Sequence, residues 1–178
     1  LAVLLAPLVA FIRLVDRDIV ELHSATNQLY YPEHEGHSKV DVTADRIARL
    51  APHLEVERRV TDLEELPWGD FADVDCALAG LDSLRARQLM SEKLSPLQIP
   101  YIDGAVGDPL LVRVQVLLPG KACLECAWSA AHYRQLATEY PCHARATEAA
   151  RTLAPSCAGA ATAAEMVTQC VKLFSDDA

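Results

Sequence analysis

Two acids, a glutamine and a lysine are the first residues of this chain whose types and order could do chemistry. The apolar run Phe11–Val15 is followed by a set of polar side chains: Asp16, Asp18, Gln28 and Lys39. Ligands of open α/β sheets bind beyond the carboxyl ends of the strands, so an acid there can accept hydrogen bonds from ribose hydroxyls. A lysine further along can meet phosphate charge. The alternative is a core strand followed by a charged surface turn.

A third acid, Asp82, follows the apolar run Val74–Ala79 and Gly80. If this run and Phe11–Val15 are neighbouring parallel strands, both ends open into one crevice. One carboxylate could then hold ribose and the other Mg²⁺, which prefers oxygen ligands and substrate phosphates. The simpler interpretation is that Asp82 only caps a helix and that Lys39 is an ordinary surface lysine.

The pair Cys123 and Cys126 has the spacing with which two thiolates bind one ion, and zinc strongly favours such a pair. A structural zinc ion needs four ligands, and the candidates for the other two are Cys142, Cys157, His132 and His143. A redox pair is the rival hypothesis. Redox pairs usually open a helix directly after a strand, whereas this one follows a Pro-Gly turn, which favours zinc.

Cys142 lies beside His143 on an expected loop, where a thiol can be exposed and partly ionised. It is therefore a candidate nucleophile, with a zinc ligand and an inert loop cysteine as the alternatives. Cys76 and Cys170 lie on apolar faces and are interpreted as core residues.

Composition excludes several classes of protein. The formal charge is −9, from 16 Lys+Arg against 25 Asp+Glu. Nucleic-acid-binding proteins normally carry a basic face, so we expect no nucleic-acid partner. The apolar stretch Leu1–Val15 contains Pro7 and is too short to span a bilayer, and it lacks the basic start and cleavage site of a signal peptide. We expect no membrane association and a cytoplasmic location.

The elements that must position these residues alternate between strand and helix patterns. Helical periodicity covers Val40–Ala51, and Asp82 or Ser83 can cap a helix that runs to Leu94. The remaining expected strands are Leu54–Val60, Ile99–Ala105 and Leu110–Leu118, and the remaining expected helices are Trp128–Glu139 and Ala160–Phe174. This order predicts an α/β fold, Rossmann-like, with a mainly parallel sheet flanked by helices and additional antiparallel strands in the C-terminal half.

Taken in order, these residues resemble the ThiF/MoeB/HesA family of the ubiquitin-activating adenylyltransferase superfamily. The resemblance covers most of the chain, which predicts a single adenylation domain over residues 1–178. It is carried by Leu14–Leu22, Gln28, Gly36, Lys39, Gly80–Asp82, Arg85, Pro100–Gly107, Leu118–Cys126, Ser156–Gly159 and the helix that ends at Phe174.

The resemblance implies an enzyme that uses ATP and Mg²⁺ to adenylate the C-terminal carboxylate of a ubiquitin-like or sulfur-carrier protein or of a peptide. It implies that Asp16 holds the ribose, that Lys39 contacts the phosphates, and that Asp82 serves Mg²⁺ and the nucleotide. Asp18, Asn27 and Gln28 join the nucleotide-binding set. It further implies a structural zinc on Cys123 and Cys126, a thioester cysteine at Cys142, and a homodimer or heterodimer.

Three features depart from the family pattern. Leu1–Ala10 contains no glycine where a phosphate-binding loop is expected, Asn27 stands in place of an arginine, and there is no second Cys-x-x-Cys. The domain can therefore be incomplete at its N-terminus and C-terminus. The second hypothesis is a catalytically degenerate scaffold that binds a peptide or partner enzyme. A nicotinamide-dependent oxidoreductase ranks last, because no G-x-G-x-x-G motif is present.

Overall fold

The computed structural model describes residues 1–22, 28, 30–107, 111–139 and 156–175, which form two small sheets with helices around them. One sheet pairs β1 (Phe11–Val15) with β2 (Glu55–Arg59) in parallel. In the other, β3 (Ala77–Ala79) is parallel to β4 (Tyr101–Gly107), and β4 is antiparallel to β5 (Leu111–Leu117). The predicted α/β fold with an antiparallel strand in the C-terminal half is confirmed.

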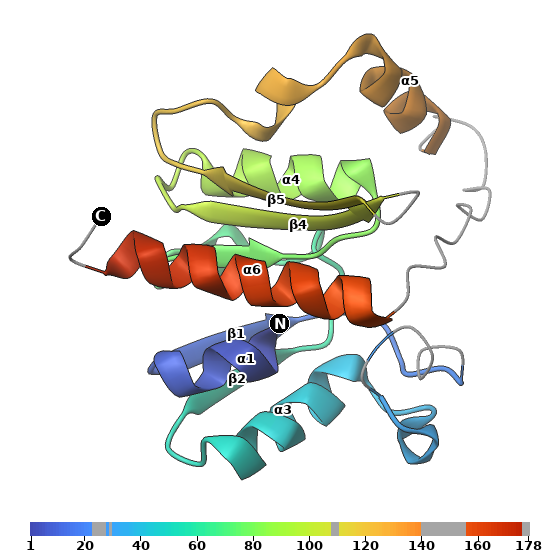
Figure 1. The fold of residues 1–178 in the computed structure, drawn as a ribbon, viewed down its shortest axis with the longest axis vertical. Coiled ribbons are helices and arrows are strands. Elements are labelled where there is room, and N and C mark those ends of the chain that lie inside the picture. Colours follow the sequence, from blue (N-terminus) through green and yellow to red (C-terminus); the bar gives the residue numbers. More distant parts are fainter. Residues whose placement is uncertain (23–27, 29, 108–110, 140–155, 176–178) are drawn as a thin grey trace.

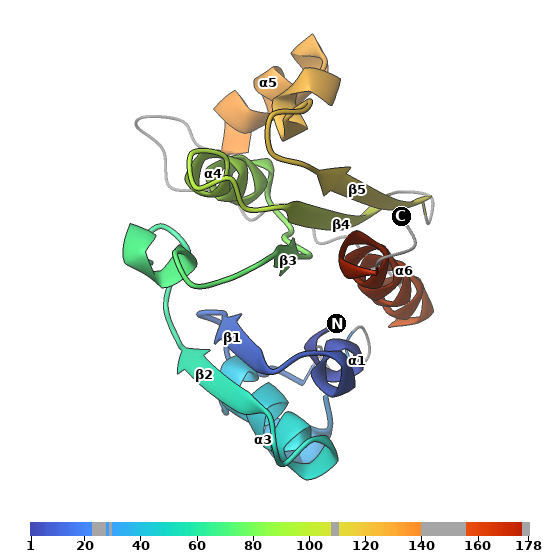
Figure 2. The same ribbon diagram turned by 90° about the vertical axis from the view of Figure 1, so that its left-hand side faces the viewer.

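Figure 2 shows the strands following one another across the molecule in the order β2, β1, β3, β4, β5. The longer helices are α3 (Lys39–Leu50), α4 (Leu84–Leu94), α5 (Ala130–Glu139) and α6 (Ser156–Phe174), and α1 (Ala2–Leu5) is a single turn. Short 3₁₀ turns span Ala6–Leu8, Pro32–His34, Trp68–Phe71 and Leu124–Ala127. No helix in these described ranges is both long and apolar enough to cross a membrane.

Strand β4 explains why the second sheet is covered on both faces. Successive side chains of a strand point to opposite faces. Tyr101 packs into a cluster with Leu94 of α4, whereas Ile102 packs with Met166 of α6. A Cβ atom at Gly104 would lie 2.2 Å from the Met166 sulfur, so the close approach of α6 depends on that glycine.

The first sheet is fixed to the segment that precedes β3 by the side chain of Arg13. Its Nη1 and Nη2 donate to the two carboxylate oxygens of Asp73 at 2.7 and 2.9 Å, and Nη1 also contacts the Asp70 carbonyl. Val15 packs against the same core cluster as β3. Because β1 is held in this way, its carboxyl end is brought towards the carboxyl end of β3.

Two sequence expectations are refined by the structure. The expected strand over residues 74–79 begins only at Ala77, because the Val74 amide bonds to the Phe71 carbonyl in a turn. The cap of α4 is Ser83, whose Oγ accepts a hydrogen bond from the Ala86 amide at 3.0 Å. Asp82 is therefore not the cap of this helix.

Candidate functional site

Asp16 and Asp82 lie at the carboxyl ends of β1 and β3. Asp16 directly follows β1, where its amide bonds to the Arg59 carbonyl at 3.2 Å, and Asp82 follows β3 after two residues. Burial raises the pKa of Asp16; the hydrogen bond from the Asp18 amide and the charge of Lys39 lower it, and the negative charges of Asp18 and Asp82 raise it, so that the pKa is raised overall. Two acids thus follow the carboxyl ends of two different strands, and the negative charge of Asp82 contributes to the raised pKa of Asp16.

Lys39 is built into this edge at the start of α3. Its amide bonds to the Asp18 carbonyl at 2.9 Å and its Nζ donates to the Asp18 carboxylate at 2.7 Å. Burial lowers the pKa of Lys39, but the Asp18 hydrogen bond and the charges of Asp18 and Asp16 outweigh it, so the pKa is raised overall. Only 13% of the side chain is exposed. Lys39 is therefore a fixed cation rather than an ordinary surface lysine.

The acids outnumber the lysine at this edge. Asp16 accepts a hydrogen bond from the Asp18 amide at 2.8 Å, and the Asp18 carboxylate is held by Lys39. Asp82 is exposed and makes no hydrogen bond with any residue that the structure describes. Facing carboxylates are unfavourable until a cation neutralises them. Carboxylate oxygens are the ligands that Mg²⁺ prefers, but no three acids, histidines or cysteines of the described residues are grouped so that they could hold an ion without further ligands such as phosphates. Lys39 adds a cation for a phosphate.

Gln28 and Asn27 complete the predicted nucleotide-binding set. Gln28 is exposed and makes no hydrogen bond with another described residue. Asn27 and Cys142 lie outside the described residues, so their predicted roles stay predictions.

Sequence reasoning missed a buried ionic network on β4 and α4. The Asp103 side chain is completely buried, and it contacts Arg87, Arg113 and the Tyr101 hydroxyl. Burial and the neighbouring charge of Asp103 raise the pKa of Tyr101, so its hydroxyl stays protonated and donates to Asp103 at 2.9 Å. The signal in the sequence was an acid in the middle of an apolar strand, which is rarely fully buried unless it is paired.

Cys123 and Cys126 lie in and beside the turn Leu124–Ala127, with their sulfur atoms 3.5 Å apart and exposed. Two Zn–S bonds of about 2.3 Å at a tetrahedral angle would separate the sulfurs by about 3.8 Å. Hydrogen bonds from Cys126 to the Cys123 sulfur lower the pKa of Cys123. The pair can therefore supply two thiolate ligands to one ion.

The remaining zinc ligands are not found among the described residues, where no three His, Cys, Asp or Glu side chains cluster. The His132 ring stacks on Trp128, and its Nδ1 accepts a hydrogen bond from the Ser129 amide at 3.0 Å. Cys157 is exposed at the start of α6. Burial raises the pKa of Cys76 to about 12, in keeping with the interpretation of Cys76 and Cys170 as core residues.

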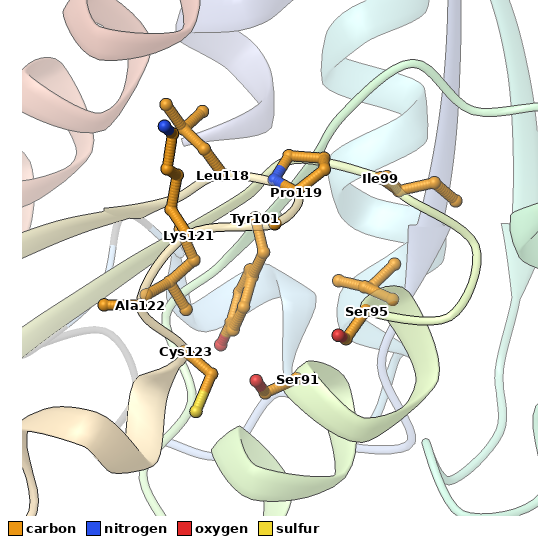
Figure 3. Close-up of a pocket in the computed structure, with 12 residues that line it drawn as sticks. Ser91, Ser95, Ile99, Tyr101, Leu118, Pro119, Lys121, Ala122 and Cys123 are labelled. Carbon is orange, nitrogen blue, oxygen red and sulfur yellow. The ribbon is translucent and has the colours of Figure 1, made fainter.

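A small pocket lies between α4 and the turn at Pro119 and Gly120 (Figure 3). Ser91, Tyr101 and Cys123 point towards it. Its volume is about 40 Å³, which is enough for a water molecule but far too small for a nucleotide. It lies at the amino end of β4, whereas Asp82 follows the carboxyl end of the neighbouring parallel strand. The pocket is therefore separate from the carboxylate edge, which consists of Asp16, Asp18, Lys39 and Asp82.

Comparison with known proteins agrees with this architecture. A sequence model of the ThiF family matches residues 4–177. The structure of E. coli MccB with ATP has a TM-score of 0.69 and 21% identity, over 96% of this chain and 50% of that one. The structure of E. coli MccB with AMPCPP and MccA has a TM-score of 0.70 and 19% identity, over 97% of this chain and 51% of that one. The structure of PaaA has a TM-score of 0.63 and 23% identity, over 94% of this chain and 58% of that one. The chain thus spans about half the length of MccB.

Proposed function

The chain belongs to the ThiF family, and on that premise we propose that it transfers AMP from ATP to the C-terminal carboxylate of a peptide or a small carrier protein. The observation that supports the proposal most is that Asp16 and Asp82 follow the carboxyl ends of β1 and β3, while the charge of Lys39 acts on Asp16 from the start of α3. In α/β sheets this is the position where nucleotides bind. The structures of MccB with ATP and of MccB with AMPCPP and MccA support both a nucleotide and a second substrate.

In the proposed reaction, a carboxylate oxygen of the substrate attacks the α-phosphorus of ATP. The bond from that phosphorus to the oxygen bridging to the β-phosphate breaks, and pyrophosphate leaves with the electron pair. Negative charge grows on the phosphate oxygens, so Mg²⁺ held by Asp82 and the Lys39 ammonium would stabilise the transition state. Asp16 would accept hydrogen bonds from the ribose hydroxyls. An ammonium group has three donors, so Lys39 keeps two when one is used by Asp18.

The test is exchange of labelled pyrophosphate into ATP by the full-length protein. Each assay would contain Mg²⁺ and either a mixture of short peptides with free C-termini or a carrier protein that ends in glycine. The matched control is the same mixture with the C-terminal carboxylates converted to amides, which cannot attack phosphorus. Exchange only with the free acids supports the proposal. Equal exchange with the amides, or none with either class of acid, contradicts it.

A non-catalytic scaffold is the second candidate, because Asn27 carries no charge and the Asp18 carboxylate is already held by Lys39. Such a protein would bind the peptide or a partner enzyme without turnover. Peptide binding without ATP binding in calorimetry would favour this function over adenylation.

Under either function we propose a dimer, of two such chains or of this chain with a partner, which sedimentation velocity would test.

We also propose that Cys123 and Cys126 are two of four ligands of a structural zinc ion. The 3.5 Å separation of their sulfurs and the lowered pKa of Cys123 support this assignment. Zinc would supply a cross-link between this turn and the segment that carries the other two ligands. Metal analysis of the purified full-length protein should find about one zinc ion per chain, and its absence would contradict the assignment.

The thioester role of Cys142 remains part of the proposal, supported only by its position in the sequence resemblance. A covalent adduct with a carrier protein should form after adenylation, disappear on treatment with a thiol, and be absent in Cys142→Ala. An adduct that survives in that variant would contradict the assignment.

A further inference from the structure

Arg87 of α4 contacts three acceptors that belong to two other parts of the chain. Its Nη1 donates to the Gly104 carbonyl at 3.1 Å and to the Asp103 carboxylate, both on β4. Its Nη2 donates to the carbonyl of Leu81, in the loop that leaves β3. Only 9% of the Arg87 side chain is exposed. A single guanidinium group therefore ties the helix, the strand and the loop together.

Stability alone is a weak explanation for this network. Burying a carboxylate and a guanidinium group costs several kcal/mol in desolvation, and buried ion pairs can often be replaced by packed apolar side chains without loss of stability. Asp103 also keeps two other partners, the Tyr101 hydroxyl at 2.9 Å and Arg113 Nη2 at 3.2 Å. Arg87 is thus not needed merely to neutralise Asp103, and its bond to the loop requires a separate reason.

That reason lies in the loop itself, which joins β3 to α4 through residues 80–83. The loop is fixed on one side of Asp82 by the Arg87 bond to the Leu81 carbonyl and on the other by the Ser83 cap. The exposed Asp82 carboxylate has no hydrogen-bond partner among the residues that the structure describes. Its position is consequently set by the backbone on either side of it.

We propose that Arg87, held by Asp103, is a positioning residue that fixes the Leu81 carbonyl and thereby aims the Asp82 carboxylate at the metal ion of the bound nucleotide. This inference rests on the proposed function. Arginine suits the task because its planar fork reaches several acceptors in a fixed geometry, whereas lysine presents a single point charge. The buried ion pair between α4 and β4 thus acts through the backbone on a ligand of the site.

Arg113 offers a matched control on the same carboxylate. Its Nη2 also bonds to Asp103, but its side chain is 39% exposed and none of its hydrogen bonds reaches the loop. Arg87→Lys and Arg113→Lys each keep a positive charge near Asp103. Only Arg87→Lys removes the hydrogen bond between the guanidinium group and the Leu81 carbonyl.

The experiment is a titration of full-length protein with Mn²⁺ in the presence of AMPCPP, in which free Mn²⁺ is measured by electron paramagnetic resonance. We expect Arg87→Lys to weaken AMPCPP-dependent Mn²⁺ binding about tenfold or more, and Arg113→Lys to stay within about twofold of wild type. If Arg87→Lys does not fold, Asp103→Asn should show a weakening of similar direction, because the Arg87 fork then loses its charged anchor.

The positioning role of Arg87 and the proposed function are contradicted by different results. If wild type binds Mn²⁺ with AMPCPP and Arg87→Lys binds it as tightly as Arg113→Lys does, the positioning role is overturned while the proposed function stands. Wild-type protein that binds no Mn²⁺ with AMPCPP would overturn the proposed function and this inference together. Equal melting temperatures of the two lysine variants, with unequal Mn²⁺ affinities, would exclude a purely structural effect.

Discussion

The carboxylate edge and the cysteine pair are built in opposite ways. Asp16 and Asp82 follow two different strands and Lys39 begins a helix, so only the folded chain brings the charges of Lys39 and Asp82 to bear on Asp16. Cys123 and Cys126 are held by a single 3₁₀ turn, with their sulfurs already 3.5 Å apart. The edge thus depends on tertiary structure, whereas the cysteine pair is formed locally and lacks further ligands among the described residues.

This difference predicts how each region responds to change. A site assembled from several segments should lose function sharply when one residue is altered, while the fold remains. Loss of a cysteine from a pair that binds an ion together with distant ligands should instead lower the stability of the fold, because the bound ion connects separate segments. The following variants test this contrast.

Replacement of Lys39 should have the largest effect. Lys39→Met removes the cation next to the growing phosphate charge, so pyrophosphate exchange should fall about 10²- to 10³-fold, as for loss of a single transition-state donor elsewhere. Lys121→Met is the matched control, because Lys121 is exposed near the small pocket. Equal rates for the two variants would remove Lys39 from the reaction.

Removal of metal should affect the cysteine pair next. If zinc binds to Cys123 and Cys126, a chelator should lower the melting temperature of wild type by about 5–10 °C, which corresponds to the loss of a tightly bound ligand. Cys123→Ser should melt at the lower temperature with or without chelator. Asp82→Asn should respond to chelator as wild type does. A chelator effect that persists in Cys123→Ser would show that the metal binds elsewhere.

Neutralisation of Asp16 should have the smallest effect, and in the opposite direction. Burial raises the pKa of Asp16 in the folded protein, so its ionised form destabilises the fold once the pH exceeds the usual value for aspartate. Asp16→Asn should therefore melt about 2 °C higher than wild type at pH 7 without nucleotide. The difference should vanish as the pH falls below the usual pKa of aspartate. A lower melting temperature at pH 7 would contradict the burial argument.

Much of this arrangement follows from local sequence patterns. The strands, the helix from Lys39 and the Ser83 cap are set by periodicity and by capping residues, which act over a few positions. The positions of Asp16 and Asp82 after strands were predicted because each follows an apolar run in the sequence. The order of elements then restricts how the strands can be arranged.

The contacts that the sequence did not reveal are all between distant segments. The Asp18–Lys39 ion pair depends on a bridge between Ile19 and Ser38, and no local pattern predicts it. The Arg87–Asp103 pair forms only after α4 packs on β4. Helical spacing and strand alternation indicate which residues are buried, but they do not indicate which buried charges meet.

Nucleotide binding through a metal ion is what we propose for the carboxylate edge. It is tested most directly by calorimetric titration of full-length wild type and Asp82→Asn with ATP, each with and without Mg²⁺. We predict that wild type binds ATP more tightly with Mg²⁺ and that Asp82→Asn loses most of this Mg²⁺ dependence. Absence of ATP binding by wild type, or an unchanged Mg²⁺ dependence in Asp82→Asn, would contradict the account.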